Sequence, residues 1–173
     1  MTPVYRPLLK SDLRKWESLA RSEFASADFC DAKYLLERWD KLKGFVLQTP
    51  RGEWIGVAIL DFSGNKYNDG GCHILEVVLF PKYRNSAYIL HLGKIIFENA
   101  KGHKKSASVR PKNRAPTGIM RRLGFENSGR EWYWLGSSPG LWGGIIPGFW
   151  NVWTCSPDFY PKILRKVKLK LRS

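Results

Sequence analysis

Segments with different hydrophobic periodicities follow one another along the chain. After a first helix capped by residues 11–12, apolar positions at helical spacing predict helices over residues 32–40, 86–100 and 115–123. Apolar runs and alternations predict strands over residues 4–8, 44–49, 53–61, 73–80, 106–109 and 131–135. The order is therefore β, α, α, β, β, β, α, β, α, β. The predicted fold class is α/β (α+β), a sheet flanked by helices.

Three segments between or after these elements have a composition of their own. Residues 50–52 (Pro-Arg-Gly) signal a turn, so the strands beside them are expected to pair as an antiparallel hairpin. Residues 63–71 are polar and glycine-rich, which predicts a mobile loop. Residues 137–160 hold aromatic side chains among many turn formers and keep neither periodicity. We expect an extended arm that packs over the open side of the sheet; alternatively, its rings stack on nucleotide bases.

Length and composition indicate one globular domain. With 173 residues, 43% of them hydrophobic, the chain can bury a full core. Its uninterrupted apolar runs are far shorter than the ~20 residues of a membrane-spanning helix. The first residues contain no apolar stretch of the signal-peptide kind. We therefore expect a cytoplasmic protein without a membrane span.

Neither the cysteines nor the histidines have the spacing of a metal site. Cysteines stand at Cys30, Cys72 and Cys155, without a Cys-x-x-Cys pair. The histidines His73, His91 and His103 lack a two-ligand helical spacing. We expect neither a disulfide framework nor a bound metal.

The charge is strongly positive and unevenly distributed. There are 29 Lys and Arg residues against 15 Asp and Glu, a net charge of +14. Residues 99–125 and 161–173 contain basic residues and no acid. This predicts a polyanionic partner, with nucleic acid (DNA or tRNA) first and an anionic membrane surface second; otherwise, the charge solvates the surface or meets an anionic cofactor. The expected nucleic-acid contacts are Lys104, Lys105, Arg110, Lys112, Arg114, Arg121, Arg122, Arg165, Lys166 and Lys168.

Arg84 follows the apolar strand predicted at residues 73–80, whose composition is typical of burial on both faces. A helix is predicted directly after it. Unpaired N–H groups at a helix start carry roughly half a positive charge, so such a turn can bind a pyrophosphate, and an arginine would strengthen the contact. The alternative is that Arg84 is a solvated loop residue.

Two motifs carry a family resemblance. The segment 78–88, with Pro81-Lys-Tyr-Arg84, and the segment 113–125, from Asn113 to Gly124-Phe125, resemble the core motifs of the GCN5-related N-acetyltransferase (GNAT) superfamily. The resemblance covers about residues 4–136. It implies a mostly antiparallel mixed sheet and a GNAT-like domain over residues 1–136, followed by the aromatic arm (137–160) and a basic tail (161–173).

The resemblance also implies a cofactor and an activity. GNAT enzymes bind acetyl-CoA through the splayed central strand and the pyrophosphate turn, and an amine attacks the thioester directly. The implied cofactor-binding residues are Val78, Leu79, Arg84, Asn85, Ser86, Ala87, Tyr88 and Asn113.

Catalysis would need a base for the amine and a proton donor for the leaving thiolate. Glu76, on the predicted central strand, is the candidate base; alternatively it is an ordinary strand-edge carboxylate. Met120 stands where the family commonly has a tyrosine, seven residues after Asn113, and cannot donate a proton. The candidate substitute donors are Ser108, Thr117 and Tyr133.

A second departure concerns the pyrophosphate turn. Ile89 stands where the family has a small residue. Arg84-Asn85 without the glycine pair resembles the phage Mom-type DNA-modification branch, although Arg110-Pro111 replaces that branch's Asp-Pro. The predicted function is an acyl-CoA-dependent N-acyltransferase (a transferase) acting on an amine of nucleic acid or carried on it, such as a modified DNA base or an aminoacyl-tRNA. The alternatives are an inactive nucleic-acid-binding module and an acetyltransferase for a protein or small-molecule amine.

Overall fold

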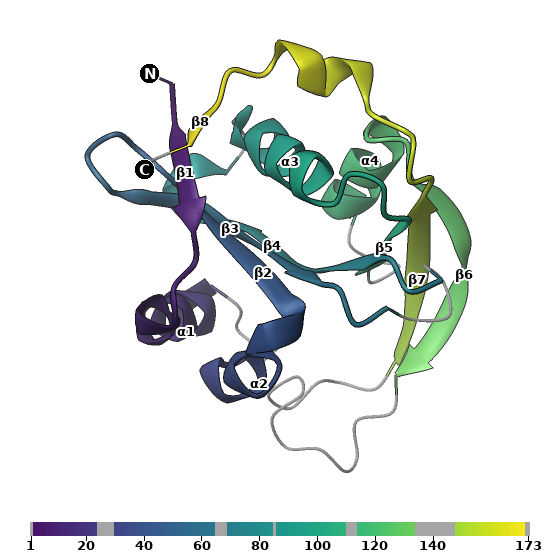
Figure 1. The fold of residues 1–173 in the computed structure, drawn as a ribbon, viewed down its shortest axis with the longest axis horizontal. Helices are drawn as coiled ribbons and strands as arrows, with labels where there is room; N and C mark the ends of the chain where they lie inside the picture. The colour runs from purple at the N-terminus through teal and green to yellow at the C-terminus, as the bar shows by residue number, and fades with distance from the viewer. Residues whose placement is uncertain are drawn as a thin grey trace.

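The computed structural model describes residues 2–23, 30–64, 69–84, 86–109, 114–133 and 148–171. The described strands form one eight-stranded sheet in the order β6-β7-β5-β4-β3-β2-β1-β8 (Figure 1). Their bounds are Val4–Pro7 (β1), Leu42–Gln48 (β2), Trp54–Asp61 (β3), Cys72–Leu79 (β4), Lys105–Val109 (β5), Glu126–Tyr133 (β6), Gly148–Cys155 (β7) and Lys170–Leu171 (β8). Neighbours pair antiparallel except β4 with β5 and β1 with β8, which are parallel. The hairpin expected around residues 50–52 is confirmed as β2 and β3.

Helices cover both faces of the sheet (Figure 1). The α-helices are Leu13–Glu23 (α1), Ala32–Glu37 (α2), Tyr88–Asn99 (α3) and Arg114–Arg122 (α4). Short 3-10 helices span Lys10–Asp12 (η1), Trp39–Lys41 (η2), Pro81–Tyr83 (η3) and Lys162–Lys166 (η4). One core packs α3 against the sheet and the other packs α1 and α2 against the opposite face. The expectation that residues 73–80 are covered on both faces holds, because Ile74 of β4 belongs to the first core and Val78 to the second.

Within the described residues, no helix combines the length and apolarity needed to cross a membrane. The helix ends follow local hydrogen bonds. Asp12 does not cap α1 as expected: it accepts from the Leu9 N–H at 2.8 Å, so a 3-10 turn precedes the helix. The stop at Gly124 is confirmed, since Gly124 has φ +77° and the Phe125 and Gly124 N–H groups donate to Met120 and Arg121 carbonyls, a Schellman motif.

The C-terminal third differs most from the sequence expectation. Residues 148–155 of the predicted irregular arm form β7, which lies between β5 and β6. Alternation was hidden there because apolar residues are buried on both faces of β7: Trp153 and Cys155 join the core under α3, and Val152 on the opposite face is also buried. The basic tail is not a solvated extension: Leu164 in η4 is fully buried and β8 pairs with β1.

Candidate cofactor and acyl-transfer site

A bulge in β4 determines the geometry at the centre of the sheet. Against β3, Leu60 pairs with Ile74 while Ile59 pairs with Glu76, so Leu75 is an extra residue. Side chains two residues apart in a regular strand share a face. The bulge breaks that rule: Ile74 joins the core under α3, whereas Glu76 contacts Cys30 of the core under α1 and α2.

At the same point β4 and β5 part. Within the described residues they pair only from Cys72 to Ile74, although β4 continues to Leu79. The Val78 carbonyl is turned to β3, where it lies 2.4 Å from the position of a β-carbon on Gly56. Backbone polar groups alternate between the two edges of a strand, so Val77 and Leu79 direct theirs to the opening between β4 and β5. This favours Leu79 over Val78 for a main-chain contact with a cofactor.

The turn after β4 leads into α3. Its Arg84 is exposed, and Arg84 Nε donates to the Leu79 carbonyl at 3.2 Å. Ser86 Oγ bonds the Tyr83 carbonyl and accepts from the Tyr88 N–H at 3.3 Å. Ala87 is the N-cap residue of α3 and has no side-chain cap. The turn thus presents an arginine and a helix start side by side, as a pyrophosphate site requires.

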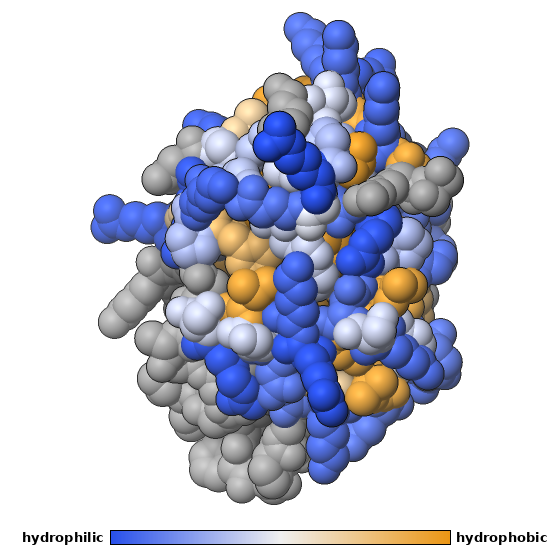
Figure 2. Space-filling model, turned by 90° about the vertical axis from the view of Figure 1, so that its left-hand side faces the viewer, coloured by the Kyte–Doolittle hydropathy of each residue, from blue (hydrophilic) through white to orange (hydrophobic). Residues whose placement is uncertain are grey.

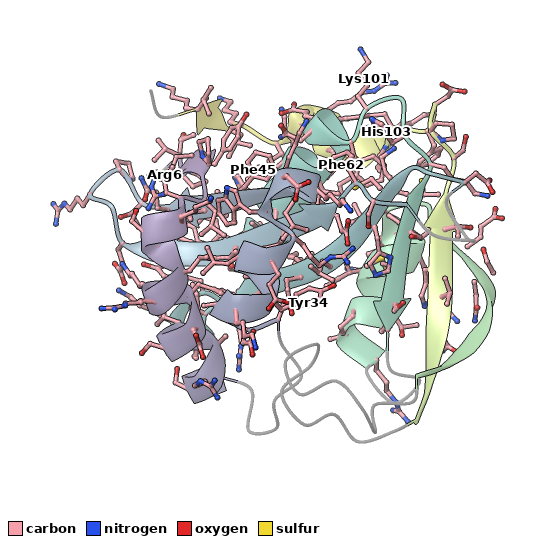
Figure 3. All side chains as sticks on the ribbon, turned by 60° about the horizontal axis from the view of Figure 1, so that its bottom comes forward. Arg6, Tyr34, Phe45, Phe62, Lys101 and His103 are labelled. Atoms are coloured by element: carbon pink, nitrogen blue, oxygen red, sulfur yellow. The ribbon has the colours of Figure 1, made fainter. Side chains whose placement is uncertain are left out.

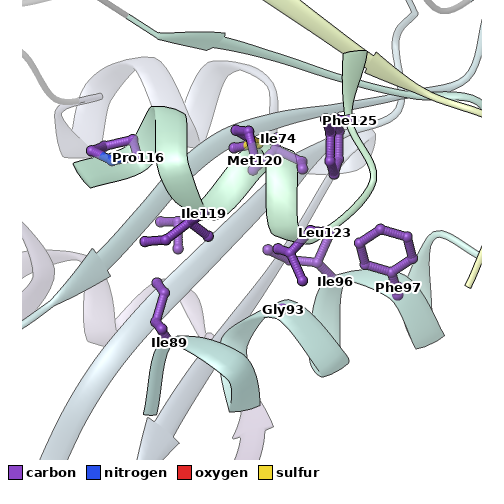
Figure 4. Close-up of a pocket in the computed structure, with 11 residues that line it drawn as sticks. Ile74, Ile89, Gly93, Ile96, Phe97, Pro116, Ile119, Met120, Leu123 and Phe125 are labelled. Carbon is purple, nitrogen blue, oxygen red and sulfur yellow. The ribbon is translucent and has the colours of Figure 1, made fainter. Parts of the chain in front are cut away.

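An apolar cavity of about 80 Å³ lies between α3, α4 and β4 (Figure 4). Ile74 and Val77 contribute from β4, Ile89 and Gly93 from α3, and Met120 from α4, among others. A second cavity of about 180 Å³ continues beyond Ile89. It is lined by Ser86 and Ala87 of the turn before α3, Ile89 and Leu90 of α3, Ile119, Arg122 and Leu123 at α4, and Ile163 of η4.

The two cavities adjoin, because Ile89, Ile119 and Leu123 line both, and together they mark out a route. The route runs from the Ser86 turn, between α3 and α4, to the place where β4 and β5 part. Its outer end is polar and basic, and its inner end is apolar. A long cofactor with an anionic end and a slender arm matches this gradient.

No protein-family model matches the sequence, and no curated protein matches it. Solved structures do match. A mutant of the spermidine N-acetyltransferase SpeG from Vibrio cholerae has a TM-score of 0.67 at 12% identity, over 90% of this chain and 94% of that chain. NAA60 from Arabidopsis thaliana, in complex with a bisubstrate analogue, has a TM-score of 0.67 at 16% identity, over 89% and 97%. The Vibrio cholerae spermidine N-acetyltransferase in complex with CoA and spermine has a TM-score of 0.63 at 14% identity, over 88% and 93%.

These neighbours are GNAT acetyltransferases. The chain has the GNAT fold. At such low identities the likeness establishes the architecture alone, and it extends past residue 136, where the sequence resemblance ended, because it covers 90% of the chain. The mostly antiparallel sheet that the resemblance implied is confirmed.

Within the GNAT fold, Glu76 lies on the α1 and α2 side of the sheet and is only 7% exposed. Its Oε1 accepts from the Cys30 N–H at 2.7 Å. Burial and the nearby Glu76 charge raise the pKa of the Cys30 thiol well above its usual value, so the thiol stays protonated. Met120 packs against the core under α3, whereas Glu76 contacts Cys30 of the other core. The two side chains therefore lie on opposite faces of the sheet, near the point where β4 and β5 part.

Other polar groups gather on the side of Glu76. Tyr34 lies on α2 below the sheet (Figure 3), and the guanidinium of Arg38 stands 5.5 Å from its ring centre. Burial raises the pKa of Tyr34 to about 12, so its hydroxyl remains a donor at neutral pH. Arg38 also pairs with Asp61 at 2.8 Å.

Sequence reasoning missed one polar pair beside Glu76. His73 Nδ1 lies 2.9 Å from Ser106 Oγ, joining β4 to β5 just before they part. His73 was considered only as a metal ligand, and among the described residues no cluster that could hold a metal is found. The available signal was its position three residues before Glu76. The bulge brings both side chains to the same side of the sheet.

Of the remaining predicted site residues, some lie within the described part of the chain and others do not. Ser108 lies on β5 one residue past the last β4 pair, on the same face as Ser106. Tyr133 ends β6, and its side chain lies outside the described part of the chain. Asn85 and Asn113 also lie outside it.

One predicted nucleic-acid contact is wrong. Lys105 is 1% exposed, its Nζ donates to the His103 carbonyl at 2.9 Å, and it lies over the Phe97 ring. Burial lowers its pKa. The cause is position, since odd-numbered residues of β5 face the core under α3. Lys105 is an internal cation that an external polyanion does not reach.

The other basic residues of that set lie at the surface where the structure describes them. Lys104 pairs with Asp69 at 2.9 Å, and the guanidinium of Arg121 stands 5.8 Å from the ring centre of Trp153. Both line a hollow of about 590 Å³ beside the exposed ring of Phe159. Arg114, Arg122, Arg165, Lys166 and Lys168 are also exposed, while Arg110 and Lys112 fall outside the described residues. Figure 2 views the molecule from the left-hand side of Figure 1 and shows separate hydrophobic patches among hydrophilic side chains on that face.

Proposed function

We propose that the chain is an acyl-CoA-dependent N-acyltransferase that uses acetyl-CoA. The observation that carries this is the route between α3 and α4, which leads from a basic helix start to the split between β4 and β5. A fold shared with a spermidine N-acetyltransferase solved with CoA supports it. The cofactor arm would follow the unpaired edge of β4, where Val77 and Leu79 present main-chain groups.

The anionic end of the cofactor would bind the turn before α3. Arg84, Ser86, Ala87 and Tyr88 supply a guanidinium, a hydroxyl and helix-start N–H groups. Asn85 and Asn113 are proposed contacts from the sequence resemblance.

The acceptor amine would approach from the side of Glu76. Its nitrogen forms a bond to the thioester carbon, the C–S bond breaks, and the electron pair leaves with sulfur. Glu76, directly or through water, takes the proton from the amine. The thiolate needs a proton that Met120 cannot supply, so Ser108 or Tyr133 is the proposed donor. Most of the rate enhancement would come from holding the amine and the thioester next to each other in a reactive orientation.

We infer that the acceptor amine is carried on nucleic acid. A protein with a net charge of +14 repels free polyamines and attracts phosphates. The hollow lined by Arg121, Glu126 and Phe159 places an exposed arginine beside an exposed ring, which suits base stacking with one phosphate contact, while Lys104 at its rim is paired with Asp69.

Cofactor binding is tested by calorimetry with acetyl-CoA. Arg84→Ala is expected to weaken binding by about 1.5–3 kcal/mol, the range for a hydrogen bond to a charged group. Arg51→Ala, an exposed arginine in the turn between β2 and β3, is the matched control and should change nothing. Equal affinity for the wild type and the Arg84 variant would place the pyrophosphate elsewhere.

Acceptor class is tested by following labelled acetyl groups. Aminoacyl-tRNA, DNA, spermidine and a peptide are offered in parallel, and transfer to a nucleic acid is expected. Transfer to spermidine or the peptide alone would contradict the acceptor and leave the acyltransferase in place.

An inactive nucleic-acid-binding module is the second candidate. Met120 at the expected donor position and Ile89 in the wall of both cavities favour it. Salt-dependent nucleic-acid binding without measurable acetyl-CoA binding would select this alternative.

A further inference from the structure

We propose that η4 and the end of α4 form a recognition element for the 3′-phosphate of coenzyme A, with Lys166 and Arg122 as its contacts. This inference rests on the proposed function and deepens it, since it assigns a cofactor-specificity role to the C-terminal segment. The sequence suggested only a general polyanion contact for these two residues.

The first support is the position of η4. Ile163 of η4 lines the 180 Å³ cavity together with Ser86 and Ala87 at the start of α3 and Arg122 at the end of α4. The diphosphate is proposed to bind at Ser86 and Ala87. The nucleotide beyond it would therefore meet α4 and η4.

The second support is that η4 is firmly held. Leu164 is fully buried and would lie 3.6 Å from a β-carbon on Gly93 of α3. Lys94 Nζ donates to the Val167 carbonyl at 2.7 Å. These contacts fix the backbone on both sides of Arg165 and Lys166. Ligand binding therefore has to order only the cationic side chains and not the segment that carries them.

The third support is which side of η4 each cation occupies. In a 3-10 helix, residues three apart are eclipsed. Lys166 therefore follows Ile163 on the side of the cavity, and Leu164 points into the core. Arg165 lies elsewhere: burial raises the pKa of Tyr160 and the charge of Arg165 opposes that rise, which places Arg165 near Tyr160.

The fourth support is charge. Ion pairs among the described residues involve neither Arg122 nor Lys166. Both are exposed, and Arg122 lines the cavity, while Lys166 lies three residues after Ile163, the η4 residue that lines it. A dianionic phosphate at the end of a long ligand would neutralise the two cations, and the diphosphate would remain with Arg84.

The test compares CoA with dephospho-CoA, which lacks only the 3′-phosphate. Wild-type protein is expected to bind CoA at least about tenfold more tightly. Lys166→Ala and Arg122→Ala should each reduce that preference several-fold and leave dephospho-CoA affinity unchanged. Arg165→Ala is the matched control, an exposed cation on the same short helix, and should keep the wild-type preference.

The outcomes separate this inference from the proposed function. Equal binding of CoA and dephospho-CoA by the wild type overturns the inference and leaves the acyltransferase intact. Equal effects of Lys166→Ala and Arg165→Ala also overturn it, because they indicate general attraction. Loss of nucleic-acid affinity with an unchanged CoA preference assigns these cations to nucleic acid instead. Binding of neither cofactor removes the proposed function and the inference together.

Discussion

At the scale of single residues, one extra residue in β4 determines which side of the sheet Glu76 faces. Without the bulge at Leu75, Glu76 would share the face of Ile74 and point into the apolar cavity under α3. With it, the carboxylate lies opposite the proposed cofactor route, among polar groups such as Tyr34 and His73. Because Glu76 and the proposed cofactor route lie on opposite sides of the sheet, the amine can reach the thioester only through the opening between β4 and β5.

Glu76→Gln is expected to lower kcat by ~10²-fold or more while acetyl-CoA affinity stays constant. The amide keeps an oxygen that can accept from the Cys30 N–H, so shape and anchoring are retained. Steady-state kinetics across pH and cofactor titration would check this. Wild-type kcat at every pH would show that water or another residue is the base.

Asp61→Asn is expected to reduce the free energy of unfolding by about 1–3 kcal/mol, because Arg38 loses its charged partner. Burial raises the pKa of Asp61, but hydrogen bonds from Ser63 and Arg38 outweigh it and hold the pKa below its usual value. The stabilisation is thus present at neutral pH and lost as pH falls through the range below about 4.

Urea denaturation at pH 7 and pH 3.5 would measure this difference, which should shrink at the lower pH. Glu53→Gln, which breaks the exposed pair with Lys82, is the control and should change the free energy of unfolding much less than Asp61→Asn does. An Asp61 variant as stable as wild type at pH 7 would mean that the pair does not stabilise the fold.

At the scale of elements, the C-terminal segments complete the fold. β7 joins β5 to β6, η4 covers α3, and β8 adds to the edge at β1. A truncation before residue 161, which would remove the basic tail, would therefore also remove buried packing. Single substitutions of exposed basic residues in the tail separate the loss of charge from the loss of packing.

Leu164→Ala is expected to cost about 2–5 kcal/mol of unfolding free energy, the usual range for a buried leucine. Ile163→Ala, next to it but 44% exposed, should cost much less. Chemical denaturation of both variants is the measurement. Equal, small losses would mean that η4 is not packed on α3 in solution.

Local signals explain which elements could be predicted. Residues 50–52 specify a hairpin turn, and Gly124 ends α4 through a positive φ, so both follow from a few neighbouring residues. β7 could not be predicted, because Val152 and Trp153, which face opposite sides of the sheet, are both apolar and buried, so no polar and apolar alternation is visible. The bulge at Leu75 depends on the register against β3, which the strand's own residues do not encode. Arg84 was placed correctly at the turn, whereas Lys105 was misjudged because strand phase was unknown.

At the scale of the whole molecule, the positive charge separates into internal, paired and exposed groups. Lys105 is internal, Lys104 and Arg38 are paired, and Arg165 and Lys168 are exposed. The exposed cations without an acidic neighbour contribute most to the long-range attraction of a polyanion, because a nearby carboxylate cancels much of the field of a paired cation.

Arg165→Gln is expected to make the salt dependence of duplex-DNA binding shallower by about 0.9 log unit if its side chain contacts one phosphate. Affinity should fall evenly across sequences. Lys33→Gln on α2, exposed but near Glu37, is the control and should leave the slope unchanged. Absence of any salt-dependent binding by the wild type would refute the nucleic-acid partner.

The position of β7 has a consequence for how the chain acquires its structure. β6 pairs only with β7 among the described strands, although β7 is made after it. During synthesis β6 must wait as an unpaired strand, and β5 keeps an open edge, until residue 155 has emerged. This late, long-range closure favours slow folding and a transient risk of intermolecular strand pairing. The strands that carry the proposed proton donors, β5 with Ser108 and β6 with Tyr133, are thus fully paired only after almost the whole chain exists.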